Sequence, residues 1–130
     1  MDFAIFVKNA SLNAIETAIG TSPVCRIRTG AKPTAPEDAD SGTVLATMTL
    51  PSDWMGDAAS AAKALIGTWQ DSAADADGIA GHFRIYQSDG TTCGIQGTCG
   101  EAGSGADMIL QNTDINAGQE ITITDFDLTA

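Results

Sequence analysis

The segment HFRIYQSDGTTCGIQGTCG, residues 82–100, constrains the fold of this chain more strongly than any other. Apolar residues alternate on both sides of Ser88-Asp89-Gly90, a sequence typical of a turn. A three-residue loop here would place Gly90 where a left-handed backbone is required. The residues that this loop would pair are Ile85 with Cys93 and Phe83 with Ile95. The segment therefore predicts an antiparallel hairpin whose odd-numbered residues face the core.

The same segment holds the only histidine, His82, and two of the three cysteines, Cys93 and Cys99. On one extended strand the two cysteines lie roughly 20 Å apart, beyond the about 7 Å between Cα atoms that a disulfide spans, so they could bond only if the chain reverses near Gly97. His82 is expected opposite Gln96, on the face away from Cys93, which disfavours a Cys/His nucleophilic pair.

A zinc site would need all of the histidine and cysteine ligands in the chain, and no two of them have the close spacing of a typical zinc motif. We therefore expect the cysteines to act as small apolar residues. We predict no catalytic residue, no cofactor and no metal site, and we do not expect an enzyme.

The length of 130 residues and the hydrophobic content of 43% fit a single domain over residues 1–130. The net charge of −11 repels phosphate groups, so we expect neither nucleic acid nor a membrane surface as a partner. The opening MDFAIFVKNA has an acid at position 2 and no basic region before its apolar patch, so we do not expect it to be a secretion signal. No basic residue follows Arg84, and such an acidic second half is compatible with a soluble surface, a basic partner or adaptation to high salt.

Apolar periodicity divides the chain into one helix and several strands. Leu12, Ile15 and Ile19 fall on one helical face, and Gly20 precedes a proline at position 23, which predicts a short helix over residues 10–19. Period-two segments predict strands. The further elements expected are strands within 24–30, 43–50, 65–70, 106–113 and 120–130, a helical turn at 57–64, and loops at 31–42 and 114–119.

In the last strand the inward face changes from Ile121 and Ile123 to Phe126 and Leu128, which predicts a β-bulge near Asp125. Seven to eight short strands after one short N-terminal helix indicate a mainly β fold. We expect an antiparallel β-sandwich of the jelly-roll or immunoglobulin-like type.

Several other segments invite a chemical interpretation that their composition does not support. PEDADSG (36–42) and DSAADADG (71–78) place oxygen ligands as a calcium loop does, but the first lacks the bidentate glutamate at the twelfth position, so both are expected to be solvated loops. The glycine-rich GEAGSGAD (100–107) has acids where a phosphate loop needs lysine, and we expect a flexible hairpin connection there.

Three stretches carry a family resemblance: RIRTGAKPTAPEDADSGTVLATMTLP, AGHFRIYQSDGTTCGIQGT and DMILQNTDINAGQEITITDFDLTA. Their order after a short N-terminal helix resembles small virion proteins of tailed bacteriophages and prophages over nearly the whole chain. The cysteines at 93 and 99 and the strong acidity depart from that pattern. The resemblance implies a capsid decoration or cement protein on the virion surface, made in the host cytoplasm. It also implies the major capsid protein as partner and a homo-oligomer, with a trimer favoured.

The apolar stretch FAIFV near the N-terminus is too hydrophobic to remain in solvent. It is either a core strand or a docking arm, residues 1–9, that adds to the exposed sheet edge of a neighbour. The residues that we expect to contact a partner are Phe3, Ile5, Phe6, Val7, Trp54, Arg26 and Arg28.

Two rival functions remain open. An adhesion or carbohydrate-binding module would use Trp54, Trp69 or Tyr86 as a stacking platform. A hydrolase would require a pocket that holds His82 or a close pair of carboxylates.

Overall fold

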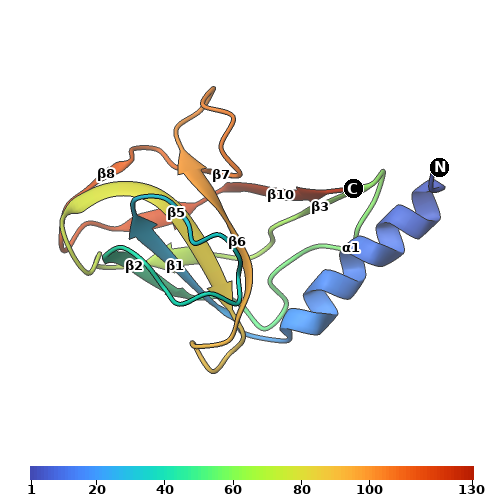
Figure 1. Ribbon diagram of the computed structural model, residues 1–130, viewed down its shortest axis with the longest axis horizontal. Helices are drawn as coiled ribbons and strands as arrows, with labels where there is room; N and C mark the ends of the chain where they lie inside the picture. The colour runs from blue at the N-terminus through green and yellow to red at the C-terminus, as the bar shows by residue number, and fades with distance from the viewer.

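The computed structural model describes residues 1–130 and has one helix and ten short strands, which confirms a mainly β fold with a single N-terminal helix (Figure 1). The elements are α1 (Ile5–Ile19), β1 (Val24–Thr29), β2 (Val44–Thr49), β3 (Ala62–Ala64), β4 (Trp69–Asp71), β5 (Gly78–Tyr86), β6 (Cys93–Gly100), β7 (Met108–Ile109), β8 (Asp114–Ile115), β9 (Ile121–Ile123) and β10 (Asp125–Thr129).

Eight strands form one sheet in the order β2-β1-β5-β6-β7-β10-β3, with β8 paired to β5, and β4 pairs with β9 in a second, small sheet. Since β6 and β7 are parallel, the sheet is mixed, and the prediction of a purely antiparallel sandwich is wrong. The glycine-rich segment between these strands forms a wide loop instead of the expected hairpin. Its Gly103 and Gly105 have positive φ, and the Asp107 carboxylate at its end accepts hydrogen bonds from the backbone N–H and hydroxyl of Thr98.

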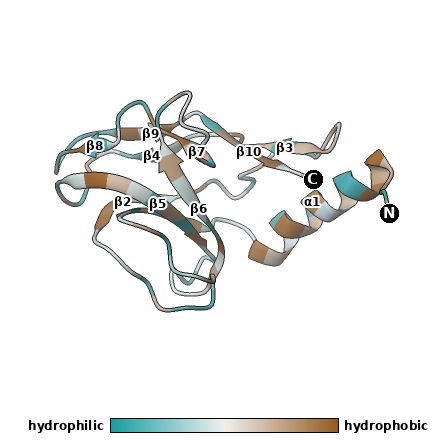
Figure 2. Cartoon of the chain, turned by 45° about the horizontal axis from the view of Figure 1, so that its top comes forward, coloured by the Kyte–Doolittle hydropathy of each residue, from teal (hydrophilic) through white to brown (hydrophobic).

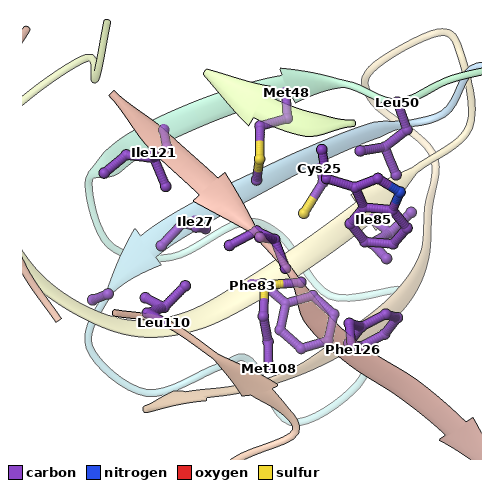
Figure 3. Close-up of a cluster of buried hydrophobic side chains, with 14 of the residues drawn as sticks. Cys25, Ile27, Met48, Leu50, Phe83, Ile85, Met108, Leu110, Ile121 and Phe126 are labelled. Atoms are coloured by element: carbon purple, nitrogen blue, oxygen red, sulfur yellow. The ribbon is translucent and has the colours of Figure 1, made fainter. Parts of the chain in front are cut away.

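The core lies between the inner face of β1, β2, β5 and β6 and the strands near the C-terminus, and it joins twenty buried apolar residues (Figure 3). Phe126 of β10 makes an edge contact with Phe83 of β5, with ring centroids 5.3 Å apart, and a tilted contact with Trp69 at 5.5 Å. Aromatic pairs in these geometries add to the stabilisation that burial alone provides.

The last strand changes its inward face near Asp125, as the sequence predicts. Ile121, Ile123 and Phe126 are all buried although their parity differs. The chain passes at this point from β9, which pairs with β4, to β10, which pairs with β7 and β3. The parity change therefore marks a change of sheet, a larger rearrangement than the expected bulge.

The β5–β6 hairpin exists, and Gly90 has the expected left-handed φ of 71°. The predicted pairs, Ile85 with Cys93 and Phe83 with Ile95, are wrong, because the register shifts by one residue next to Gly94. The observed pairs are His82 with Thr98, Phe83 with Gly97, Arg84 with Gln96, Ile85 with Ile95, and Tyr86 with Cys93. A side chain at Gly94 would collide with Ile19 at the end of α1, so this extra residue lies where the helix approaches the strand.

The helix begins at Ile5, whereas the sequence predicted residues 10–19. No proline interrupts the preceding apolar residues, and β-branched or aromatic residues lower helix propensity only slightly, so the helix extends through them. Residues 5–9 are therefore helical and not an extended arm. The helical turn predicted at 57–64 is also wrong, since this segment is irregular and ends in β3, with positive φ at Ser60 and Ala61. The strand predicted at 65–70 appears later, as β4.

Candidate functional site

The outer face of the sheet, opposite the core, carries a group of polar residues in three cross-strand rows. Strand pairing places Arg28 of β1 beside His82 of β5, and Arg26 beside Arg84. The third row contains Tyr86 of β5 and Cys93 of β6. Arg84, His82 and Tyr86 are buried, with at most 1% of each residue exposed. Buried polar side chains need hydrogen-bond partners, and here a single loop supplies most of them.

That loop is the β1–β2 connection, residues 30–43, which we call the strap. Arg84 donates hydrogen bonds to three strap carbonyls, those of Ala35, Pro36 and Asp38, at 2.9–3.2 Å. Its Nε and Nη2 also donate to Oε1 of Gln96, whose own amide donates to the carbonyl of Pro33 at 2.7 Å. The guanidinium of Arg84 thus satisfies loop carbonyls that have no strand partner.

Asp40 is the carboxylate that completes this cluster. Its Oδ1 accepts hydrogen bonds from Nη1 of Arg84 and from the hydroxyl of Tyr86, each at 2.6 Å, and its Oδ2 lies 3.1 Å from Nη2 of Arg28. Burial raises the pKa of Asp40, but the hydrogen bonds from Tyr86 and Arg84 and the nearby arginine charges outweigh it. The pKa of this carboxyl is therefore held below its usual value.

His82 lies at the base of the strap. Its Nδ1 is 2.9 Å from the carbonyl oxygen of Gly30, and because a carbonyl only accepts, this nitrogen carries the proton. Its Nε2 is buried and has no hydrogen-bond partner, and Nε of Arg28 is in the same condition. Desolvation by burial lowers the pKa of His82 below its usual value, and the charges of Arg28 and Arg84 lower it further against the hydrogen bond to Gly30.

Arg26 and Arg28, two of the expected partner contacts, form bonds within the chain. Nη1 of Arg26 donates to the carbonyl of Gly90 at 2.6 Å, and its guanidinium lies 5.0 Å from the ring centroid of Tyr86. Arg28 is only 8% exposed and pairs with Asp40. Arg28 is therefore almost completely covered, whereas Arg26 is half-buried and keeps part of its side chain exposed.

The three cysteines are free thiols. Cys25 is buried in the core and Cys99 packs against it, whereas the register shift turns Cys93 to the outer face. The chain does not reverse at Gly97, which lies within β6. Burial raises the pKa of Cys99 to about 12, and it also raises the pKa values of Cys25 and Cys93, so all three are held as unreactive thiols at neutral pH.

A groove of about 450 Å³ runs along the edge of the strap, and Asp40, Arg84 and Cys93 are among its lining residues. Its two central charges, Asp40 and Arg84, are already paired with each other. No group of three histidine, cysteine or acidic side chains is arranged to hold a metal ion, and the helix is too short to cross a membrane. The hydrogen bonds and ion pairs of the polar cluster hold the strap against the sheet.

The N-terminal end of α1 has the opposite character. Phe3, Ile5 and Phe6 are 61%, 51% and 76% exposed, and Val7 is 38% exposed. Figure 1 shows the N-terminal part of the helix extending past the β-rich body, and Figure 2 shows that its outermost turn is apolar. We call these four residues the apolar end of α1. Phe3 precedes the helix, and Ile5, Phe6 and Val7 are three successive residues of its first turn, so their side chains point in different directions around the axis. A helix that is apolar on all sides is normally covered.

The other end of α1 is fixed to the body. Leu12 and Ile19 are buried. Lys63 of β3, which is 1% exposed, pairs with Glu16 at 2.7 Å and donates to Oδ1 of Asn13 at 2.8 Å and to the carbonyl of Gly56 at 2.7 Å. Asn9 also accepts a hydrogen bond from the amide of Ala61 at 2.9 Å, so the hydrogen bonds between the helix and the body begin at its second turn.

The aromatic residues expected to stack on a sugar are not accessible. Trp54 and Trp69 are fully buried, with ring centroids 6.0 Å apart, and Tyr86 is buried beneath the strap. Trp54 was also expected to contact a partner, and the structure does not support that assignment, because its indole N–H donates to the carbonyl of Gly20 inside the protein.

Sequence reasoning did not identify Asp40 and Gln96 as partners of buried arginines, or Lys63 as a buried cation. One signal was present for Arg84 and Tyr86, which share the even face of β5 with His82 beside a strand that carries Arg26 and Arg28. Three arginines on adjacent strands repel one another unless a carboxylate lies over them. The acidic loop 31–42 was the nearest segment of the sequence that could have supplied such a carboxylate.

Comparison of the chain with protein-family models, with curated proteins and with solved structures finds no match in any of the three.

Proposed function

We propose that this protein is a structural component of a tailed-phage virion, a capsid decoration or cement protein that binds the outer shell and stabilises contacts between major capsid subunits. The observation that carries the proposal is the apolar end of α1, exposed on a chain of net charge −11. Covering a large apolar side chain contributes up to roughly 1.5–3 kcal/mol. Four such side chains together form a credible anchor for a larger assembly.

The shape of this surface favours a protein partner over a small molecule. Small ligands bind in concave pockets, whereas the apolar end projects from the body (Figure 1). An amphipathic or apolar helix commonly binds by entering a groove of its partner. The net charge of −11 disfavours anionic lipid and nucleic acid, which leaves a protein groove as the proposed receptor.

The proposed role depends on interface area and requires no catalytic residue. A clamp that binds the assembled shell and not the free subunits stabilises the shell by mass action. The proposal includes a homo-oligomer, a trimer at three-fold positions of the shell, and a sandwich-like architecture of jelly-roll or immunoglobulin-like type. The major capsid protein is the proposed partner.

The test is the occupancy of purified virions from the phage or prophage that encodes the chain. We expect hundreds of copies per particle on the wild-type virion, because a symmetric shell offers many equivalent positions. The double variant F3S/F6S should lose this occupancy at least about tenfold, which corresponds to only about 1.4 kcal/mol of binding energy. The matched control is Ile79→Ser, since Ile79 is 59% exposed elsewhere on the surface and should be dispensable.

Three results would contradict the proposal. The protein could be absent from the particle, it could be present in only a few copies, as a tail or portal component would be, or F3S/F6S could bind as well as the wild type. Loss of occupancy in both F3S/F6S and Ile79→Ser would also reject the apolar end as the specific anchor.

A further inference from the structure

The strap spans residues 30–43 and connects two adjacent strands that a short turn could have joined. Connections longer than about 12–15 residues without secondary structure are uncommon in compact domains and usually serve a function. Most strap residues are exposed on their outer side. Its attachment to the protein comes from the side chains beneath it.

The two ends of the strap are joined by backbone and side-chain hydrogen bonds. The amide of Thr29 donates to the carbonyl of Thr43, and the amide of Thr43 donates to the hydroxyl of Thr29. Between these ends, the attachment to the sheet is made by Arg28, His82, Arg84, Tyr86 and Gln96. The middle of the strap can therefore detach without breaking the β1–β2 pairing.

Several charged and titratable groups lie close together beneath the strap. The titratable and charged groups that face His82 and Asp40 are Arg28 from β1, Arg84 and Tyr86 from β5, Cys93 from β6, and Glu37 and Asp38 from the strap. Arg28 and Arg84 both pair with Asp40. Neutral His82 adds no charge to this arrangement, whereas protonated His82 would be a third cation next to two arginines.

If the second ring nitrogen of His82 were protonated, no nearby group could accept its hydrogen bond. Nδ1 already donates to Gly30, and the only other ring nitrogen, Nε2, is buried without any partner. A proton on Nε2 would be a buried donor with no acceptor, which costs free energy in the closed state. Once the strap detaches, water can hydrate the imidazolium. Acid therefore favours the detached strap.

We propose that the strap is an acid-released latch, in which protonation of His82 and then of Asp40 detaches residues 31–42 from the outer face of β1, β5 and β6 while the core stays folded. Detachment exposes a face that carries Arg28, Arg84 and His82 as three cations. This inference is independent of the proposed virion role, because it involves no residue of the apolar end of α1.

The direction of the pH dependence follows from the two pKa shifts. The pKa of His82 is lowered in the closed state, so the closed strap has its full stability above the ordinary value of 6.5 and loses it as the pH falls below that value. The pKa of Asp40 is also lowered, so its contribution is full above the ordinary value of 3.8 and is lost as the pH falls through the pKa of the folded state. Release therefore begins below about pH 6.5.

The size of the acid effect on the strap depends on the difference between the His82 pKa values of its closed and detached states. For each pH unit that separates the His82 pKa values of the detached and closed states, acid shifts the equilibrium between them about tenfold towards detachment. Detachment below pH 6.5 should therefore be steep enough to measure.

The experiment is an NMR titration of the intact protein from pH 7.5 to about pH 3, so that the range extends below the ordinary pKa of 3.8 for Asp40. His82 is the only histidine, so its ring signals are unambiguous. We expect the amide signals of residues 31–42 to change with the same midpoint as the His82 ring, while the amides of β9 remain at their native positions. Strap amides that stay unchanged throughout the titration would overturn the proposal, as would a core that unfolds with the strap.

Two variants separate the contributions. His82→Gln keeps a polar side chain that does not titrate, so its strap amides should be insensitive to pH between 7 and 5. Asp40→Asn should show a larger detached fraction at pH 7 than the wild type. A His82→Gln strap that responds to acid as the wild type does would reject the role of the histidine, and an Asp40→Asn strap as closed as the wild type at pH 7 would reject the role of the carboxylate.

Discussion

Two regions depart from the usual distribution of side chains. The polar cluster under the strap is buried, whereas the apolar end of α1 is exposed. Around Arg84, charged and polar groups are buried, and nearly all of them are bonded to groups of the same chain. At the apolar end, the side chains of Phe3 and Phe6 are largely exposed to solvent. A buried polar group that is satisfied internally serves the fold. An exposed apolar group with no partner indicates a contact outside the chain.

Residue types alone would suggest the opposite roles for these two regions. Arginines, a histidine, a tyrosine and a cysteine close together resemble a reactive centre, whereas the start of an ordinary helix does not. In this protein the first group is occupied by its own loop, through Asp40 and the strap carbonyls. The start of the helix is the region whose side chains remain exposed.

The largest expected effect on stability is that of Arg84→Met. This change leaves three strap carbonyls without their donor and removes one of the three donors of Asp40. We expect a cost of about 3–4 kcal/mol, because each acceptor that is left without a partner costs about 1 kcal/mol or more. Urea denaturation should show a lower midpoint with an unchanged slope. Arg26→Met is the matched control on the same face, and we expect it to cost about 1 kcal/mol, for a single hydrogen bond. Equal losses in the two variants would contradict the central position of Arg84.

Lys63→Met should have the next largest effect, because it removes the buried cation that joins α1 to β3. We expect a loss of about 2–3 kcal/mol, since three acceptors lose their donor. The amides of residues 8–19 should exchange faster with solvent. Lys32→Met, at an exposed lysine, should change stability by less than about 0.5 kcal/mol. A helix that stays protected in Lys63→Met would show that Leu12 and Ile19 alone hold it.

Asp40→Asn should cost less, because 42% of the Asp40 side chain is exposed and solvent screens its ion pairs. We expect about 1 kcal/mol at pH 7. The pKa of Asp40 is lowered on folding, so its stabilising contribution is full above 3.8 and is lost as the pH falls through the pKa of the folded state. Thermal unfolding of the variant and the wild type should therefore converge in acid, and a constant difference across this range would contradict the account.

The smallest expected effect on folding is that of F3S/F6S. Both side chains are largely exposed, so the free energy of unfolding of the isolated, dilute protein should change by less than about 0.5 kcal/mol, as measured by chemical denaturation. A loss comparable to that of Arg84→Met would place these rings in the fold and remove the contrast between the two regions.

Local patterns predicted much of this architecture. The alternating strands β1 and β2, the β5–β6 hairpin with its left-handed Gly90 and the parity change at β10 follow from periodicity and turn chemistry. The hairpin register was mispredicted because β6 carries an extra residue at Gly94, at a place where Ile19 of a distant helix leaves no room for a side chain. The parallel β6–β7 pair likewise depends on how the loop at 101–107 closes on Thr98.

The candidate sites were only partly predictable for the same reason. Hydrophobicity alone identified Phe3, Ile5, Phe6 and Val7, although it did not reveal that the last three are helical. The strap cluster depends on contacts between residues far apart in the sequence, such as Asp40 with Tyr86. No local pattern encodes which acid of an acidic loop will cover which arginine.

Hydrogen exchange of the protein, free and bound to the virion, tests the central contrast most directly. We predict that binding slows exchange in residues 5–10, the first helical residues at and just after the apolar end of α1, and leaves exchange in residues 31–42 of the strap unchanged at neutral pH. Protection of the strap on binding, with the apolar end exchanging as in the free protein, would contradict the account and would identify the polar cluster as the intermolecular surface.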